Sequence, residues 1–184
     1  MLEKYYNKFD IVSPTYPELT IDGADNVDMK YLKSLKLKNN NLKILPRFHC
    51  SQTFTINDLL TLFSSSTTMN NFLKILSRRI KANKFDGVLF DCIQLWLDET
   101  VYNTFYSNFL PALSQSLHNN NKELIFTLFP YSETITRNFV NSKHFSDLAQ
   151  YIDYFNIMTY DYIQYHSLTQ QETQNNHIFN VSLT

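Results

Sequence analysis

The sequence predicts an α/β fold in which parallel β-strands alternate with helices. Three times along the chain, a helical pattern ends in a turn rich in Asn and Lys, and a short apolar run follows. The turns lie at Asn39–Asn41, Asn83 and Asn119–Asn121. Asn tolerates the left-handed conformation that ends helices, and the chain has only 2 Gly to serve instead. Strands that alternate with helices in this way are typical of βα units with parallel pairing.

The apolar runs have the length and continuity of strands that are covered on both faces. Pro46 breaks one of them, which requires a bulge or an early strand end. Among the helices, Thr55 and Asp58 form a capping pair at the start of one, and another carries an amphipathic stripe of Phe72, Leu73, Leu76 and Ile80. The expected strands are Asp10–Ser13, Lys43–Phe48, Gly87–Gln94, Leu124–Phe129 and Tyr154–Thr159. The expected helices are Val27–Leu37, Ile56–Phe63, Met69–Ala82, Thr100–Leu117 and Phe145–Tyr151.

Composition excludes several classes of protein. With 184 residues, 43% hydrophobic and 18% charged, the chain fits one globular domain. A net charge of −1 without a long basic block argues against a nucleic-acid partner. No apolar run approaches the ~18 residues of a membrane span, and Met1–Phe9 lacks the apolar segment of a signal peptide. Either the protein is cytosolic or its true start lies upstream of Met1.

Other residue types give weaker signals. Cys50 and Cys92 make neither a disulfide framework nor a zinc signature, and we expect two small buried free thiols at strand ends. No metal or organic cofactor is expected. Four lysines cluster at the end of a predicted helix, where cations interact favourably with the helix dipole. These lysines are Lys30, Lys33, Lys36 and Lys38. His49 and His144 are expected to be surface or loop histidines.

Five parallel strands fit an open doubly wound sheet or part of a closed (βα)8 barrel. A doubly wound sheet that binds nucleotide needs a Gly-rich first turn, and Gly23 and Gly87 do not supply one. A complete barrel typically takes ~250 residues. The chain would then be short by about three βα units.

Polar residues gather at two predicted strand ends. The run FDGVLFDCIQLW, from Phe85 to Trp96, is a buried strand that ends in a lone carboxylate. The run YFNIMTYDY, from Tyr154 to Tyr162, ends in a Tyr-Asp-Tyr cluster. Two such strand ends predict one pocket of the size of a sugar.

At Asp86-Gly87 and at Met158–Asp161 the sequence resembles glycoside hydrolase family 18. The resemblance covers nearly the whole chain and implies a partial (βα)8 TIM barrel with about five of eight βα units. Residues 1–163 would form strands two to six, and residues 164–184 a polar loop or truncated tail. The site of such a barrel lies at the carboxyl ends of its strands.

The resemblance also implies that the catalytic acid is missing. Chitinases of the family carry D-G-x-D-x-D-x-E on the fourth strand; Asp86, Gly87 and Asp91 match, whereas Leu89 and Ile93 replace an acidic residue and the catalytic Glu. In this substrate-assisted hydrolysis the Glu protonates the leaving oxygen. General acid help is worth roughly 10² to 10⁴-fold, so we expect no useful chitinase activity. Period-two alternation should turn Leu89, Asp91 and Ile93 to the barrel interior and Val88, Phe90 and Cys92 to the other face.

Binding of carbohydrate is the function expected to remain. By resemblance, Tyr160 and Asp161 would hydrogen-bond the N-acetyl group of a sugar, and Met158 would line the floor. The further candidates for sugar contact are Asp91, Trp96, Tyr16 and Tyr131. Tyr160 and Trp96 could instead serve in packing. Arg47 can pair with Asp91, and a paired Asp91 would have a structural role, since an unpaired carboxylate in a barrel is unfavourable.

Three functions stay open at this point. The first is a non-catalytic, chitinase-like protein that binds an amino-sugar oligosaccharide, chitin or glycolipid; the resemblance adds secretion or a lysosomal route and a trafficking receptor as partner. The second is an active glycoside hydrolase acting on N-acetylglucosamine-containing glycans, or an esterase, that uses Asp91, Asp161 or Glu133. The third is a truncated fragment without function, whose open strand edges make it prone to aggregate.

Overall fold

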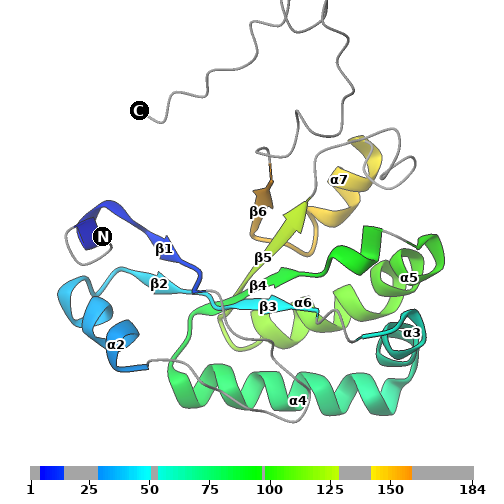
Figure 1. Ribbon diagram of the computed structural model, residues 1–184, viewed down its shortest axis with the longest axis horizontal. Coiled ribbons are helices and arrows are strands. Elements are labelled where there is room, and N and C mark those ends of the chain that lie inside the picture. The colour runs from blue at the N-terminus through cyan, green and yellow to red at the C-terminus, as the bar shows by residue number, and fades with distance from the viewer. Residues whose placement is uncertain (1–4, 15–28, 51–53, 97, 129–141, 159–184) are drawn as a thin grey trace, which may run out of the picture.

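The computed structural model describes residues 5–14, 29–50, 54–96, 98–128 and 142–158 (Figure 1). In these residues every paired strand is parallel to its neighbour. Strand β1 pairs with β2, and a second sheet has the order β3-β4-β5-β6. The strands are β1 (Ile11–Val12), β2 (Lys43–Ile44), β3 (Arg47–His49), β4 (Gly87–Asp91), β5 (Glu123–Leu128) and β6 (Tyr154–Ile157).

Backbone hydrogen bonds join the two sheets around Pro46. The amide of Leu45 donates to the carbonyl of Val12 at 3.0 Å, and on the other side the amide of Leu89 donates to the carbonyl of Pro46 at 2.8 Å. Proline has no N–H, so the ladder is interrupted at this residue. The expected strand Lys43–Phe48 is therefore present as β2 and β3, with the break where the sequence predicted it. The strands form one parallel surface, as the βα pattern predicts.

Helices connect the strands and cover one face of the main sheet. Figure 1 shows α4 and α6 running along the same side of the strands, with α3 and α5 near the strands' carboxyl ends. The helices are α2 (Met29–Lys38), α3 (Ile56–Ser64), α4 (Ser66–Asn83), α5 (Glu99–Thr104), α6 (Leu110–His118) and α7 (Ser142–Leu148). Among the described helices, even the longest, the 18-residue α4, lacks the apolar character of a bilayer-spanning segment.

The helix expected over Thr100–Leu117 is divided into three parts. Between α5 and α6 lies a π-helical turn, η3 (Phe105–Phe109), and Pro111 follows at the start of α6. Proline cannot donate the backbone hydrogen bond of a regular α-helix and its ring crowds the carbonyl one turn earlier, so a wider turn before it relieves that conflict.

The ends of the helices follow local rules. At α3, Thr55 and Asp58 form the predicted capping box, and the hydrogen bonds from Thr55 lower the pKa of the Asp58 carboxyl. Left-handed residues follow α6 at Asn121 (φ 53°) and α4 at Lys84 (φ 57°). The helix end expected near Asn83 is confirmed, although Lys84 and not Asn83 takes the left-handed conformation. None of Asn39–Asn41 has a positive φ.

Two apolar clusters lie on opposite faces of the main sheet. The large one fills the space between strands and helices, where Phe90 stacks on Phe48 with 5.1 Å between ring centroids. The small one consists of Leu45, Leu89 and Ile125, with Ile11 packed against it. Because Leu89 belongs to the small cluster and Val88, Phe90 and Cys92 to the large one, the predicted alternation along β4 is confirmed for these residues. The small cluster marks the barrel interior.

Asp86 and Gly87 hold the base of β4 against its neighbours. The Asp86 carboxylate accepts a hydrogen bond from the Lys36 ammonium at 2.6 Å and another from the Ile44 amide at 2.9 Å. A Cβ on Gly87 would lie 2.0 Å from the carbonyl oxygen of Glu123 on β5. Only glycine permits this approach of two backbones.

Gly87→Ala should therefore lower the free energy of unfolding by at least about 3 kcal/mol, because a backbone carbonyl cannot move aside as a side chain can. Urea denaturation of the wild type and the variant measures the change. Glu123→Ala serves as a control, since it leaves the clashing carbonyl in place and should not rescue Gly87→Ala. A change below about 1 kcal/mol would show that the strands separate easily at this point.

A disulfide joins Cys50 to Cys92, so the prediction of two free thiols is wrong. The register pairs His49 with Asp91, the last residues of β3 and β4. The next residue after each strand is a cysteine, so Cys50 and Cys92 lie opposite each other with their Cα atoms 4.8 Å apart. The two cysteines are 42 residues apart in sequence, and only the pairing of β3 with β4 brings them together. No local pattern could have predicted that pairing.

The double variant Cys50→Ala/Cys92→Ala should lose up to about 4 kcal/mol of stability, the chain-entropy value for a loop of this length. Thermal denaturation followed by circular dichroism measures the loss. Reductant should lower the melting temperature of the wild type toward that of the variant and leave the variant unchanged. A wild type that is insensitive to reductant under denaturing conditions would contradict the cross-link.

Candidate functional site

A layer of polar side chains crosses the barrel interior near the carboxyl ends of the strands. The register pairs His49 with Asp91 and Thr127 with Asn156. Leu89 pairs with Ile125 two residues earlier on β4 and β5, so Asp91 and Thr127 share a level. Both are buried, with 1% of their surface exposed. Polar residues therefore lie one layer above the small apolar cluster, at the end of the barrel where (βα)8 proteins hold their sites.

Arg47 and Asp91 form an ion pair within this layer. The Arg47 Nε donates to Asp91 Oδ2 at 2.6 Å, and Nη2 of the same guanidinium contacts the same oxygen. The Asp91 side chain is 1% exposed and that of Arg47 28% exposed. Burial of a carboxylate is tolerable here because a fixed cation lies beside it.

The second carboxylate oxygen, Asp91 Oδ1, is buried and has no hydrogen-bond partner among the described residues. An unpaired buried acceptor costs about 1–3 kcal/mol. The arrangement thus offers one acceptor that a donor on a ligand, or on residues beyond those described, can satisfy.

His49 extends the polar layer on β3. Its Nδ1 lies 3.4 Å from Nη2 of Arg47, which can only donate, so Nδ1 accepts in this contact. The sequence-based expectation that His49 is a surface or loop residue is wrong, because it belongs to a strand of the main sheet. Its place on the interior face follows from the alternation with Phe48, which packs in the large cluster.

Thr127 and Asn156 belong to this layer, and the sequence analysis did not identify them. The Asn156 amide donates to Thr127 Oγ1 at 3.3 Å, linking β5 to β6. A usable signal was present, because Asn156 lies two residues before the candidate Met158 and therefore on the same face of its strand.

The expectation that Ile93 lies on the interior face of a long fourth strand is wrong. Strand β4 ends at Asp91, and Ile93 begins a short 3-10 helix, η2 (Ile93–Trp96). Its side chain is 40% exposed. Period-two alternation no longer applies after Asp91, yet the position that matches the catalytic Glu of the family still carries no titratable group.

The remaining candidates are only partly described. Met158 follows β6, is partly buried, and its amide donates to the carbonyl of Leu128 at 3.0 Å. Trp96 ends η2, and its side chain is outside the description. Outside the described residues lie four other candidates: Tyr16, Tyr131, Tyr160 and Asp161. Glu133 and the tail 164–184 also lie outside them. Their contribution to the site and the domain boundary at 163 stay predictions.

The described part of the layer offers hydrogen bonds and not metal coordination. Within the described residues, no three His, Cys, Asp or Glu side chains group as a metal site requires. The carboxylate already has a cation beside it, and Thr and Asn supply neutral donors and acceptors. Such groups suit an uncharged, hydroxyl-rich ligand.

Parallel strands, outer helices and a polar layer at the strands' carboxyl ends define a protein of the (βα)8-barrel class with its site at that end. Residues 8–181 match the model of Glycosyl hydrolases family 18, and the chain belongs to this family. The predicted α/β fold, part of a TIM barrel, is thereby confirmed.

Solved structures show the same fold. The chain is similar to a chitinase from Chromobacterium violaceum (TM-score 0.69, 19% identity), covering 87% of this chain and 51% of that protein. It is also similar to the spore cortex-lytic enzyme SleL from Bacillus megaterium (TM-score 0.70, 15% identity), covering 87% of this chain and 37% of that protein. A third similar structure is that of a class V chitinase mutant from Cycas revoluta in complex with (GlcNAc)3 (TM-score 0.68, 13% identity), covering 85% of this chain and 50% of that protein. The chain spans about half the length of these proteins, or less.

Arg47→Met should destabilise the protein by about 3 kcal/mol, because it leaves the Asp91 charge buried without its partner. The double variant Arg47→Met/Asp91→Leu removes both charges and should be more stable than Arg47→Met alone. Urea denaturation of the four proteins of this cycle measures the coupling. Arg78→Met, a change at an exposed position of α4, is the control and should change stability by less than about 0.5 kcal/mol. Additive effects of the two substitutions would contradict the pairing.

Proposed function

We propose that the chain is a chitinase-like protein that binds amino-sugar oligosaccharides, including chitin fragments, without cleaving them. The observation that carries the proposal is the Ile at position 93, where the family's motif has its catalytic Glu. Without that acid, the leaving sugar departs without a proton. Asp91 is a poor replacement, because its Oδ2 already accepts from the Arg47 guanidinium, which favours the ionised carboxylate over a proton donor.

The polar layer supports binding. Asp91 Oδ1 is an acceptor without a protein partner among the described residues, and sugar hydroxyl and N-acetyl amide groups are donors. By family resemblance, Tyr160 and Asp161 would hold the N-acetyl group, Met158 would form the floor, and Trp96, Tyr16 and Tyr131 would present aromatic faces. The Cycas revoluta chitinase was solved with (GlcNAc)3, a ligand of this chemical class.

Within the family, the sequence resembles chitinase domain-containing protein 1, also called stabilin-1-interacting chitinase-like protein. From this resemblance we infer secretion or a lysosomal location, and a trafficking receptor as partner. The Cys50–Cys92 disulfide supports that compartment, because disulfides persist in oxidising environments and are rare in the cytosol.

The second candidate function is glycoside hydrolysis with Asp91, Asp161 or Glu133 in the place of the missing acid. The observation in its favour is the same unpartnered oxygen of Asp91, which has no protein group to satisfy it among the described residues. To act as the acid, Asp91 would have to bind a proton at this oxygen and then give it to the leaving oxygen of the glycoside.

Isothermal titration of the full chain with N-acetylglucosamine trimer to hexamer tests the proposal. We expect saturable heat at millimolar ligand or below. Tyr160→Phe and Asp91→Asn should each weaken the affinity about tenfold, the equivalent of one lost hydrogen bond. Glu99→Gln, an exposed change in the first turn of α5, is the control and should leave the affinity unchanged.

A fluorogenic chitobioside assay on the same preparation separates the two functions. The proposal expects no turnover above the blank. Turnover that disappears in Asp91→Asn would establish the hydrolase instead, and the absence of heat at millimolar ligand would end the binding proposal. Circular dichroism melting of each variant excludes loss of fold as the cause.

A further inference from the structure

A basic hollow lies at the opposite end of the strands from the polar layer. It has a volume of about 520 Å³ and opens between the carboxyl-terminal ends of α4 and α6. Four lysines line it, Lys36, Lys81, Lys84 and Lys122, together with one carboxylate, Asp86. The hydroxyl-bearing residues Ser77 and Ser116 line the same hollow. Its size is within the usual range of small-molecule sites.

The charges of the hollow are unbalanced. Asp86 is already engaged, by the Lys36 ammonium at 2.6 Å and by the Ile44 amide at 2.9 Å. Within the described residues, no Asp or Glu forms an ion pair with Lys81, Lys84 or Lys122. Three ammonium groups that line one hollow, without an ion-paired carboxylate among the described residues, repel one another, and a bound anion would relieve that repulsion.

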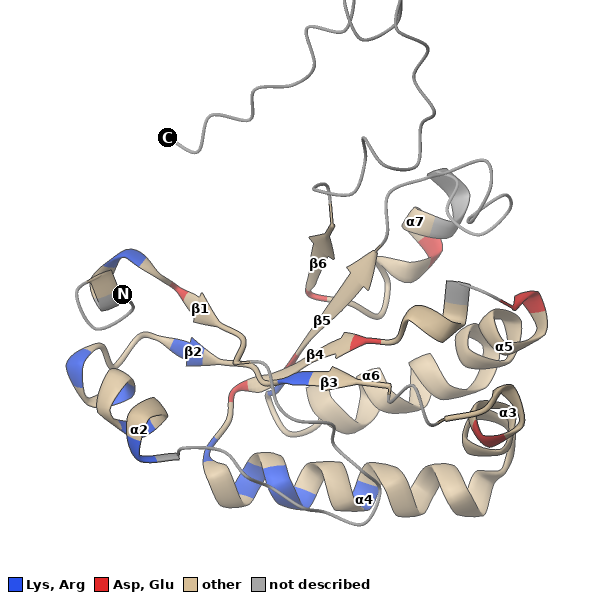
Figure 2. Cartoon of the chain, in the orientation of Figure 1, with Lys and Arg blue, Asp and Glu red and all other residues tan. Residues whose placement is uncertain are grey.

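Among the described residues, Lys and Arg gather on the elements around the hollow. Figure 2 shows Lys and Arg on α2, β2 and α4, and shows Asp and Glu on α3, α5 and α7 as well as beside β1, at both ends of β4 and at the start of β6. Lys36 and Lys43 each have a carboxylate partner, Asp86 and Glu123, and the hydrogen bond to Glu123 raises the pKa of Lys43. A field of this kind attracts small anions to the basic end.

Lys84 occupies a backbone position that does not suit it. It follows α4 in the left-handed conformation (φ 57°, ψ 38°), which is unfavourable for a residue with a Cβ and is usually taken by Gly or Asn. After α6 the corresponding left-handed residue is Asn121. The presence of Lys in this place, against its backbone preference, indicates a use for the side chain.

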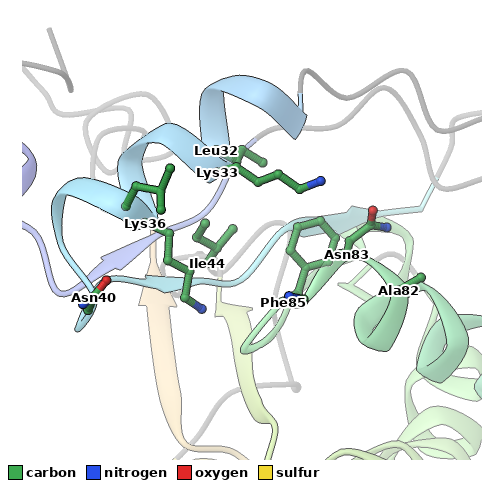
Figure 3. Close-up of a pocket in the computed structure, with 10 residues that line it drawn as sticks. Leu32, Lys33, Lys36, Asn40, Ile44, Ala82, Asn83 and Phe85 are labelled. Atoms are coloured by element: carbon green, nitrogen blue, oxygen red, sulfur yellow. The ribbon is translucent and has the colours of Figure 1, made fainter.

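An apolar recess adjoins the basic hollow. It has a volume of about 370 Å³ and lies between α2 and the end of α4 (Figure 3). Leu32, Ile44 and Phe85 form its apolar wall, and it shares Lys36 and Lys84 with the hollow. The basic hollow can hold the anionic group of a ligand, and the apolar recess can hold the apolar part of the same ligand.

We propose that these two spaces form a binding site for a phosphomonoester. The phosphate lies among Lys81, Lys84 and Lys122 and accepts hydrogen bonds from their ammonium groups. The organic part of the ester lies against Ile44 and Phe85. This site is separate from the polar layer. The proposal of phosphomonoester binding can therefore be correct or wrong whatever the outcome for sugar binding.

Lysines at helix carboxyl ends also complement the helix dipole, and the test separates that role from ligand binding. Isothermal titration of the full chain, at constant ionic strength, compares phenyl phosphate, inorganic phosphate, hexose 6-phosphate and the uncharged hexose. We expect saturable binding of phenyl phosphate, weaker binding of inorganic phosphate and none of the hexose. Inorganic phosphate that binds as tightly as phenyl phosphate would overturn the role of the recess.

Lys84→Asn is the decisive variant, because Asn suits the left-handed turn and removes the charge. It should weaken phenyl phosphate binding at least about tenfold, while its melting temperature stays equal or rises. Lys74→Gln, at an exposed position of α4 outside both spaces, should leave binding unchanged. The proposal is overturned if no anion binds at millimolar concentration, or if Lys74→Gln weakens binding as much as Lys84→Asn. Titration with N-acetylglucosamine oligomers should be the same for Lys84→Asn and wild type.

Discussion

The parallel pairing of β3 with β4 is the constraint on which the rest of the structure depends. Its register places Arg47 two residues before His49 on one strand and sets His49 against Asp91 on the next. The Arg47–Asp91 ion pair and the Cys50–Cys92 cross-link both follow from that single alignment. A shift of one residue would turn Asp91 out of the barrel and put Cys92 in its place, because alternate residues face opposite sides.

The features that the sequence predicted are those that local patterns determine. Hydrophobic periodicity located the strands and helices, Pro46 marked the interruption between β2 and β3, and the Thr55–Asp58 pair marked the start of α3. The missed features depend on distant partners. The disulfide needed knowledge of which strands pair, and the change of direction at Ile93 needed knowledge of where β4 ends. Thr127 carries no motif and becomes noticeable only when the strands align.

The two ends of the strands have different chemistry. At the carboxyl ends, a cation and a carboxylate neutralise each other inside the barrel, and Thr127 and Asn156 beside them are uncharged. At the amino ends, lysines outnumber carboxylates and remain at the surface. A neutral sugar and an anionic ester would therefore be sorted to opposite ends by electrostatics alone, without competition for one pocket.

Asp86 shows why the first residues of a catalytic signature can persist in a sequence that has replaced the last one. Its backbone amide donates to Ile44, its carbonyl accepts from Glu123, and its carboxylate binds Lys36 and the Ile44 amide. One residue thus ties α2 and β2 to the base of the main sheet, and the glycine beside it lets the sheet close. The first two residues of the motif, Asp86 and Gly87, stabilise the sheet, whereas the family's catalytic acid belongs to the last position. Selection for a stable barrel would keep these two residues whether or not the protein turns over a substrate, so their presence is no evidence of activity.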